Sequence, residues 1–265
     1  MEKREKKGLF MKRIAVITGA SSGMGRSFAL KLDASRSFDE IWLIARRTDK
    51  LRELADLLKA PARCISLDLC DATSYEEYKR MLAEEAPQID VLVCAAGVGR
   101  FGTFSEMDLD SQLRMIDLNA KALVAVTYES IPYMTRGSQV YLLDSLSSFQ
   151  PVPYINVYGS TKAFVLSFSR ALNVELVTRG IKVMAVSPGW VKTEFFDYAV
   201  TDDTIVYYNR FYEADEVVDR ALRDMKKGKD LSICGFPVRA QVFFTKLLPH
   251  RLVMKIWCKQ QKKPF

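Results

Sequence analysis

A tyrosine and a lysine stand four residues apart in the segment Tyr158-Gly159-Ser160-Thr161-Lys162. On a helix, residues at this spacing share a face, so the two side chains would lie side by side. A tyrosine normally keeps its proton, with a pKa near 10, but a neighbouring ammonium favours the phenolate and lowers that pKa. Such a pair can exchange a proton with a substrate oxygen near neutral pH. Ordinary amphipathic helices also contain this spacing, so its meaning depends on the surrounding elements.

A second group of residues could hold an anion. The segment Thr18-Gly19-Ala20-Ser21-Ser22-Gly23-Met24-Gly25 follows a short apolar run and precedes a helical pattern. Glycines let the backbone turn tightly and approach a pyrophosphate, while the helix N-terminus faces it with free N–H groups. A glycine-rich turn alone is a weak signal, but this context predicts nucleotide binding. The expected contacts are Gly19, Ser21, Ser22, Gly23 and Met24.

Two arginines, Arg46 and Arg47, follow the second apolar run. At this position of a nucleotide-binding fold, an acidic residue would bind the ribose 2′-hydroxyl of NAD. Arginines instead suit the 2′-phosphate of NADP, so the sequence predicts NADP(H) as the cofactor. The alternative is that both are surface residues of a loop between strand and helix.

The elements that must position these residues alternate along the chain. Short apolar runs predict strands at residues 13–18, 40–45, 63–67, 91–95, 139–144 and 182–187. Helical patterns occupy residues 25–34, 48–58, 74–85, 110–134 and 154–179, and a helix at 215–225 and a short strand near 231–234 follow. This alternation predicts a single doubly wound α/β (Rossmann) domain, whose parallel sheet of about six or seven strands is covered on both faces.

Composition limits the classes of function. The 265 residues contain five scattered cysteines without a CxxC pair, and one histidine, His250. These features predict a reduced, cytoplasmic protein with neither a disulfide framework nor a histidine-based triad or metal site. Residues 1–11 are expected to form a charged extension, with Met11 as an alternative start, and residues 12–245 the domain. A secretory leader and a membrane-spanning stretch are both unexpected.

The last segment, residues 246–265, carries six Lys/Arg and no acid within a chain of net charge +7. It could be a solvated basic tail. Its apolar residues recur at roughly helical spacing, which also predicts a helix with Pro249 in its first turn. Such a helix could pack near a substrate cleft, contact another subunit, or make weak peripheral contact with an anionic membrane. The apolar residues are Leu247, Leu248, Leu252, Val253, Ile256 and Trp257.

Together these motifs resemble the short-chain dehydrogenase/reductase family from about residue 12 to residue 235. The glycine-rich segment is similar to the family's TGxxxGxG, and Asp68-Leu69 to its adenine-contacting pair. Cys94-Ala95-Ala96-Gly97 resembles its NAAG motif, although Cys94 lacks the amide of the usual asparagine. Ser145 stands 13 residues before Tyr158, at the family's spacing for its catalytic serine. Further matches are Asn119 and the segment holding Pro188, Gly189, Val191 and Thr193.

The resemblance implies hydride transfer between a nicotinamide and a ketone or secondary alcohol. Tyr158 would exchange the proton, Ser145 would hydrogen-bond the substrate oxygen, and Lys162 would lower the Tyr158 pKa and bind the ribose. Asn119 would support a proton-relay water. Ser147 and Ser148 are alternatives to Ser145, although the spacing favours Ser145. The implied cofactor contacts also include Asp68, Leu69, Ala95, Ala96, Gly97, Asn119, Tyr158, Lys162, Pro188, Gly189, Val191 and Thr193.

Aromatic residues gather between positions 194 and 214, where the family has its substrate loop. They predict a small hydrophobic carbonyl or alcohol substrate of the hydroxysteroid or 3-oxoacyl type, or else they pack an ordinary lid. A homodimer or homotetramer is expected from the resemblance. A non-catalytic NADP-binding regulator is the alternative, which the set of Asn119, Ser145, Tyr158 and Lys162 disfavours. Nucleic-acid binding would rest on the positive charge alone and is not expected.

Overall fold

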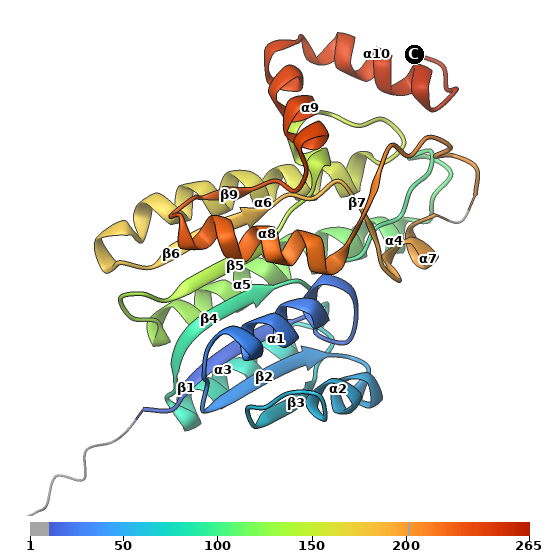
Figure 1. The fold of residues 1–265 in the computed structure, drawn as a ribbon. Helices are drawn as coiled ribbons and strands as arrows, with labels where there is room; N and C mark the ends of the chain where they lie inside the picture. The colour runs from blue at the N-terminus through green and yellow to red at the C-terminus, as the bar shows by residue number, and fades with distance from the viewer. Residues whose placement is uncertain (1–10, 201) are drawn as a thin grey trace, which may run out of the picture.

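Seven parallel strands form the central sheet of the computed structural model, which describes residues 11–200 and 202–265 (Figure 1). Residues 1–10 of the expected extension, and residue 201 of the expected substrate loop, lie outside the described residues. The strand order is β3-β2-β1-β4-β5-β6-β9, and neighbouring strands pair in parallel, which confirms the predicted doubly wound fold. The strands are β1 (Arg13–Thr18), β2 (Glu40–Ala45), β3 (Ala62–Ser66), β4 (Gln88–Cys94), β5 (Gln139–Leu143), β6 (Lys182–Val186) and β9 (Leu231–Ser232).

Both faces of the sheet are buried under helices. Ile14 and Val16 of β1 point into one hydrophobic cluster, and Ala15 and Ile17 point into the other. Helices α1 (Gly23–Ser35), α2 (Thr48–Ala55) and α8 (Ala214–Lys226) cover the face of Ala15; α3 (Thr73–Glu85), α5 (Ala122–Ser130) and α6 (Asn156–Glu175) cover the opposite face. This double burial explains why the strands read as continuous apolar runs.

The helix expected at 110–134 is not a single α-helix. It consists of α4 (Leu109–Ile116), a π-helical turn η1 (Asp117–Lys121), α5, and a 3₁₀ turn η2 (Ile131–Tyr133). Single π turns inside helices occur frequently at functional sites, and η1 contains Asn119. Strand β4 also begins at Gln88, three residues before its predicted start, because Gln88 and Asp90 break the apolar run.

The chain after β6 adds elements above the sheet. Strand β7 (Trp190–Lys192) pairs with β8 (Phe211–Glu213), and α7 (Phe195–Ala199) lies between them in sequence. The tail contains two helices, α9 (Phe236–Leu247) and α10 (His250–Gln260), where one was expected, and the predicted boundary at residue 246 falls inside α9. Pro249 is the N-cap of α10 and not part of its first turn. None of the helices within 11–200 and 202–265 is long and apolar enough to cross a bilayer.

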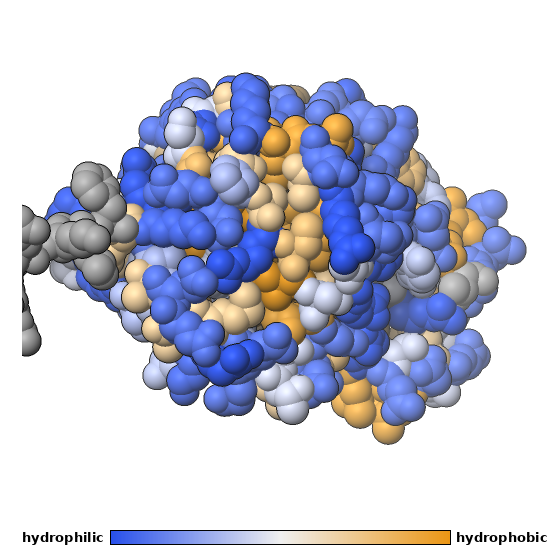
Figure 2. All heavy atoms as spheres, turned by 90° about the horizontal axis from the view of Figure 1, so that it is seen from below, coloured by the Kyte–Doolittle hydropathy of each residue, from blue (hydrophilic) through white to orange (hydrophobic). Residues whose placement is uncertain are grey.

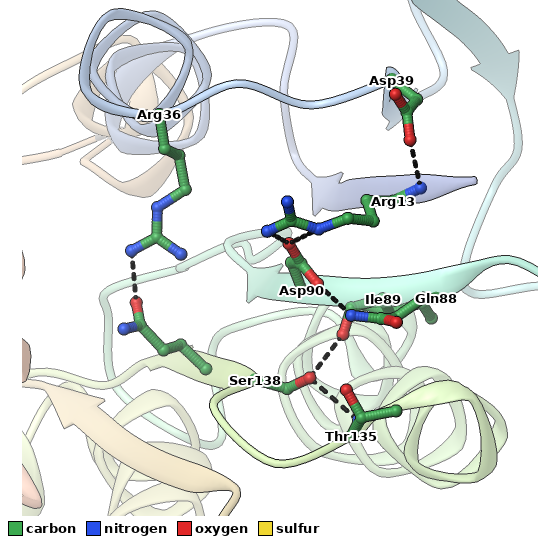
Figure 3. Close-up of polar contacts among 9 residues, drawn as sticks. Arg13, Arg36, Asp39, Gln88, Ile89, Asp90, Thr135 and Ser138 are labelled. Atoms are coloured by element: carbon green, nitrogen blue, oxygen red, sulfur yellow. Dashed lines mark hydrogen bonds and ion pairs between the residues drawn. The ribbon is translucent and has the colours of Figure 1, made fainter. Parts of the chain in front are cut away.

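The amino ends of the strands are tied by polar contacts (Figure 3). Arg13 of β1 donates through Nε and Nη2 to Asp90 Oδ2 of β4, at 2.9 and 2.5 Å. Ser138, beside β5, donates to the Ile89 carbonyl of β4 at 2.7 Å. Asp39, before β2, accepts from the Arg13 backbone N–H at 2.7 Å. These contacts join four neighbouring strands on the side of the sheet away from the glycine-rich turn.

The sheet ends at β3, whose edge faces the viewer in Figure 2. The surface there is mostly hydrophilic, with a narrow apolar band running across it. Arg63 of β3 pairs with Glu85 at 3.0 Å and lies over the Trp42 ring, 5.0 Å from its centroid. Charged side chains on an edge strand discourage pairing with a strand of another chain, so we expect the edge of β3 to remain exposed to solvent.

Candidate active site

The strand register brings the sequence motifs to one edge of the sheet. Thr18, the last residue of β1, pairs with Ile44 of β2 on one side and with Cys94 of β4 on the other. The turns that follow Thr18, Ala45 and Cys94 therefore leave the sheet at nearly the same level. The strand order reverses between β1 and β4, and ligands of doubly wound folds bind in the crevice at such a reversal.

The glycine-rich turn is too tight for side chains at two positions. Gly19 has a φ of 66°, and a Cβ there would lie 2.6 Å from the Ala96 nitrogen. A Cβ at Gly25 would lie 2.2 Å from the Gly19 oxygen. Helix α1 begins at Gly23 on the wall of the crevice, where helix N–H groups favour an anion. The turn therefore has the shape and polarity that a dinucleotide pyrophosphate requires.

The two arginines line the same crevice, next to this turn. Arg47 donates from Nη2 to Ser21 Oγ at 3.1 Å, and its Nη1 pairs with Glu194 Oε2 at 2.8 Å. Arg47 thus connects the glycine-rich turn with the start of the expected substrate loop. Arg46 lies beside it and has no comparable pair among the described ion pairs. Both guanidinium groups can reach an anion bound in the crevice.

Asp68 and Leu69, which the family resemblance assigns to the adenine, line the same crevice. The Asp68 carboxylate accepts from the Cys70 N–H at 3.1 Å and pairs with Arg114 at 3.0 Å. Burial works against the ionised form, but these two donors hold the Asp68 pKa below its usual value. Asp68 is therefore a charged acceptor at the pH of the cell.

Thr18 supplies hydrogen bonds to the turn after β4 that the Cys94 side chain cannot make. Its Oγ1 accepts from the backbone N–H groups of Ala95 and Ala96, at 3.1 and 3.2 Å. Cys94 is buried, with Sγ 3.7 Å from Thr127 Oγ1. The turn after β4 is thus held by the threonine that begins the glycine-rich motif, a role that the motif comparison did not assign to it. A hydroxyl at the end of β1, opposite the substituted asparagine, is the signal that could have identified it.

Asn119 joins the turn after β4 to helix α6. Its Nδ2 donates to the Val98 carbonyl at 2.8 Å and to Thr161 Oγ1 at 3.1 Å, and its Oδ1 accepts from the Val98 N–H at 2.9 Å. A Cβ on Gly97 would lie 3.2 Å from that same oxygen. The side-chain amide of Asn119 therefore positions the loop and the helix that carries Tyr158 and Lys162.

Ser145, Tyr158 and Lys162 line one cavity of about 610 Å³ together with the glycine-rich turn. Ser145 is the second residue after β5, and the other two lie one turn apart on α6. Lys162 is buried and donates from Nζ to the Leu143 carbonyl at 2.8 Å. The same Nζ lies 5.7 Å from the centroid of the Tyr158 ring. The side chains that the sequence singled out for proton transfer thus meet at the carboxyl end of β5.

Burial largely determines the protonation states of Tyr158 and Lys162. It raises the pKa of Tyr158 well above its ordinary value, the Ser145 hydroxyl opposes that rise, and the Asp144 carboxylate adds to it. Burial also lowers the pKa of Lys162 to about 8, although Asp144 partly offsets this effect. Tyr158 therefore holds its proton at neutral pH in the protein alone, which is the form of a proton donor.

Asp144 is a buried acid that the sequence analysis did not identify. Its Oδ2 accepts from Ser187 Oγ at 2.5 Å and from Ser148 Oγ at 2.8 Å. Burial raises the Asp144 pKa to about 7, against the lowering effect of both serines and of Lys162. Ser148 is thus engaged away from the cavity, whereas Ser147 lines it. Ser145 keeps the position beside Tyr158.

The outer half of the cavity, away from the glycine-rich turn, is mainly apolar, although Gln150, Asn209, Gln241 and Gln260 also line the cavity. Phe195 of α7 lies 5.5 Å from the Tyr158 ring, centroid to centroid, and Phe101 lies 5.7 Å from it. The two tail helices α9 and α10 also line this half, and Trp257 of α10 donates from Nε1 to the Pro153 carbonyl at 3.0 Å. Further apolar or aromatic lining residues are Val152, Ile155, Trp190, Phe196, Tyr198, Tyr207, Phe244, Leu248, Val253 and Ile256. The predicted cofactor contacts Pro188, Gly189, Val191 and Thr193 line the same cavity, and a Cβ on Gly23 of the glycine-rich turn would lie 3.1 Å from the Thr193 side chain.

Comparison with known proteins gives consistent results. The short chain dehydrogenase family matches residues 13–204, which is more than two thirds of the chain. An uncharacterized oxidoreductase of Staphylococcus epidermidis is 28% identical over 229 residues, covering 86% of this chain and 96% of that protein. Sulfoacetaldehyde reductase 2 of Chromohalobacter salexigens is 35% identical over 192 residues, covering 70% of this chain and 75% of that protein.

A solved structure resembles the whole arrangement. A short-chain dehydrogenase from Sphingobium yanoikuyae, in complex with NADPH, superimposes with a TM-score of 0.74 at 30% sequence identity. The match covers 83% of this chain and 87% of that one. The match therefore relates most of this chain to a protein whose structure was determined with NADPH.

Proposed function

This chain belongs to the short-chain dehydrogenase family of NAD(P)-dependent oxidoreductases, and we propose that it uses NADP(H) to reduce an apolar ketone. One observation carries the proposal. Ser145, Tyr158 and Lys162 line a cavity that is polar toward the glycine-rich turn and aromatic on its outer half. A dinucleotide fits the first half, and an apolar substrate with one carbonyl fits the second.

The preference for NADP(H) rests on Arg46 and Arg47. Both line the crevice after β2, where a guanidinium can bind a 2′-phosphate through charge-assisted hydrogen bonds. Glu194 competes for Arg47 in the protein alone, because its carboxylate lies 2.8 Å from Nη1. A bound 2′-phosphate would take over this guanidinium. NAD(H), which lacks that phosphate, would leave the ion pair intact.

The chain's own residues would supply the proton and the orientation. When bound, the reduced nicotinamide supplies the hydride for the carbonyl carbon. Tyr158 donates its proton to the carbonyl oxygen, and the Ser145 hydroxyl hydrogen-bonds that oxygen as charge develops on it. Lys162, held by the Leu143 carbonyl, places a positive charge near the phenolate that forms and is placed to bind the ribose hydroxyls. Asn119 fixes α6 relative to the loop after β4.

The substrate class follows from the outer lining. Phe101, Trp190, Phe195 and Trp257 offer ring surfaces and few hydrogen-bonding groups. Each methylene that is buried against such surfaces contributes about 0.8 kcal/mol to binding. A ketone with a long or flat apolar body, such as a steroid ketone or a 3-oxoacyl thioester, would therefore be reduced more efficiently than a small polar aldehyde.

The test is the loss of NADPH absorbance with a panel of steroid ketones, 3-oxoacyl thioesters, straight-chain 2-alkanones and short aldehydes. The proposal predicts that kcat/KM rises with the length of the alkanone, by roughly fourfold for each methylene that enters the cavity. It also predicts higher kcat/KM with NADPH than with NADH. Turnover restricted to short polar aldehydes would contradict the apolar substrate, and absence of turnover with every carbonyl would favour a non-catalytic NADP-binding regulator.

A further inference from the structure

Helix α9 exposes apolar side chains along one line. Phe236, Phe243 and Leu247 are 74%, 60% and 65% exposed. Their spacing of seven and four residues places them on the same side of the helix. Val238 and Val242 of the same helix are buried against the protein. Helix α9 is therefore apolar on its outer side as well as on its packed side, which surface helices normally avoid.

The rim of the substrate cavity continues this apolar line. Phe244, Leu248 and Ile256 line the cavity and are nevertheless 58%, 36% and 44% exposed, so they stand at its mouth. Leu252 of α10 is also 44% exposed. In Figure 1, α9 and α10 project from one end of the molecule, and no other labelled element of the described chain covers them there. We call the exposed side of these two helices the tail face.

Positive charge is concentrated on the same two helices and the residues after them. Residues 236–265 contain seven Lys/Arg and no Asp/Glu, and the net charge of the whole chain is +7. The remaining 235 residues therefore sum to zero. Arg239 and Lys246 flank the apolar line of α9, and Lys255 and Lys259 are exposed on α10. The tail face thus combines large apolar side chains with unopposed basic ones.

We infer that the tail face docks on an anionic lipid surface and that apolar substrate enters the cavity from the lipid through the rim. Amphipathic helices with apolar and basic faces bind anionic membranes through both groups. A second copy of the chain fits less well, because a symmetric contact would bring two segments of charge +7 together. Docking itself requires only the exposed residues, whereas substrate entry rests on the proposed function.

The experiment is flotation of the purified protein with vesicles of phosphatidylcholine, with and without about one third phosphatidylglycerol. We expect binding to the anionic vesicles at low salt, at least about tenfold stronger than to phosphatidylcholine alone, and weaker binding at high salt. No binding to anionic vesicles at low salt, or equal binding to both compositions, would overturn the inference.

Two pairs of variants test the two components of the tail face. Phe243→Ser/Leu247→Ser removes apolar area outside the cavity lining, and Val174→Ser/Val177→Ser removes similarly exposed apolar residues near the end of α6. Lys255→Glu/Lys259→Glu reverses charge on α10, and Lys226→Glu/Lys227→Glu reverses exposed charge at the end of α8. The tail variants should each lose at least about tenfold in vesicle affinity, and the controls should bind as the unaltered protein does. Equal losses in tail and control variants would refute the assignment.

Activity separates docking from substrate entry. With a long-chain ketone dissolved in anionic vesicles, the Phe243→Ser/Leu247→Ser variant should turn over at least about threefold more slowly, while a short water-soluble ketone is reduced as before. Binding without any ketone reduction would remove the proposed function and leave the docking surface intact. A dimer in sedimentation that the Phe243→Ser/Leu247→Ser change converts to monomer, without vesicle binding, would assign the tail face to a second copy instead.

Discussion

The two ends of the sheet differ in how their polar groups are used. At the amino ends, polar groups bond to each other within the protein: Arg13 of β1 donates to Asp90 of β4, and Ser138 beside β5 donates to a backbone carbonyl of β4 (Figure 3). At the carboxyl ends, the glycine-rich turn, the arginines and Tyr158 face a cavity. The same seven strands therefore carry a self-contained polar network at one end and ligand-directed groups at the other. Stability should depend on the first end and turnover on the second.

Two tyrosines show the difference most directly. Tyr141 lies inside β5 and donates to Gln139 Oε1 at 3.0 Å, toward the amino ends. Tyr158 lies beside Ser145 at the carboxyl end of the same strand and lines the cavity. Burial raises the pKa of both hydroxyls, so both hold their protons at neutral pH. Only Tyr158 can deliver its proton to a bound substrate.

The largest effect is expected from Tyr158→Phe. Removing the proton donor should lower kcat by about 10³-fold, while the fold and NADPH binding persist. The matched change Tyr141→Phe should leave kcat within about twofold and lower the free energy of unfolding by about 1 kcal/mol. Steady-state kinetics and urea unfolding of both variants provide the comparison. If Tyr158→Phe keeps most of its activity, the proton comes from another group.

The cofactor arginines should give the next largest effect. Arg46→Ala/Arg47→Ala should weaken NADPH binding by about 10- to 100-fold, or about 1.5–3 kcal/mol, and leave NADH nearly unchanged. Titration calorimetry with both nucleotides measures this difference. Glu194→Gln offers a control of opposite sign, since it frees Arg47 and should tighten NADPH binding several-fold. Equal affinity of the unaltered protein for NADPH and NADH would contradict the preference.

At the amino ends, Asp90→Asn should affect stability alone. Asp90 is buried, and its Oδ2 accepts twice from Arg13, whose side chain is 59% exposed. Solvent screens this pair, so the expected loss in the free energy of unfolding is about 1 kcal/mol. The Tm should fall by a few degrees, about 2–4 °C. A large loss of kcat at a temperature where the variant is folded would show that the two ends are not independent.

The smallest effect is expected from Asp144→Asn, which removes a charge behind the proton donor. The Asp144 carboxylate raises the pKa values of Tyr158 and Lys162. The uncharged asparagine side chain removes this effect, so both pKa values should be lower in the variant. Lys162, whose pKa is about 8, should therefore lose its charge at lower pH, and reduction that depends on this charge should decline at a pH lower by less than about one unit. The pH dependence of kcat/KM measures this displacement. Asp90→Asn is the control and should leave the profile in place.

The pH dependence of the free energy of unfolding is a second measurement of the role of Asp144. Burial raises its pKa to about 7, whereas an unfolded aspartate titrates near about 3.9. Between these two values the folded state holds a proton that the unfolded state releases, so stability falls as the pH rises through this range. The asparagine variant should lack this decline. A variant whose unfolding free energy shows the same slope between about pH 4 and pH 7 would assign that slope to other groups.

The sheet could be predicted from the sequence because its strands are buried on both faces. Double burial produces continuous apolar runs at residues 13–18 and 40–45, and the turns that follow them carry the motif residues. Parallel strands bring those turns to one edge, which is why Gly19, Arg46 and Ser145 could be expected near one another. The position of the crevice follows from the same rule.

Contacts between distant segments could not be predicted in this way. Asp144 directly follows the apolar run of β5, and the serine that donates to it, Ser187, follows a different strand. Thr18 accepts hydrogen bonds from the Ala95 and Ala96 N–H groups, a contact between two separate motifs that neither motif indicates by itself. The π turn at Asn119 leaves the helical spacing of apolar residues almost unchanged, so a continuous helix was predicted there.

Hydride transfer from NADPH in which both hydrogens at C4 of the nicotinamide are deuterium tests the central claim most directly. The unaltered protein, given a long-chain 2-alkanone, should form the secondary alcohol with one deuterium on its carbinol carbon, as read by mass spectrometry. Tyr158→Phe should form almost none in the same time, and Tyr141→Phe should match the unaltered protein. Alcohol without deuterium, or equal labelling by Tyr158→Phe, would contradict ketone reduction with Tyr158 as the proton donor.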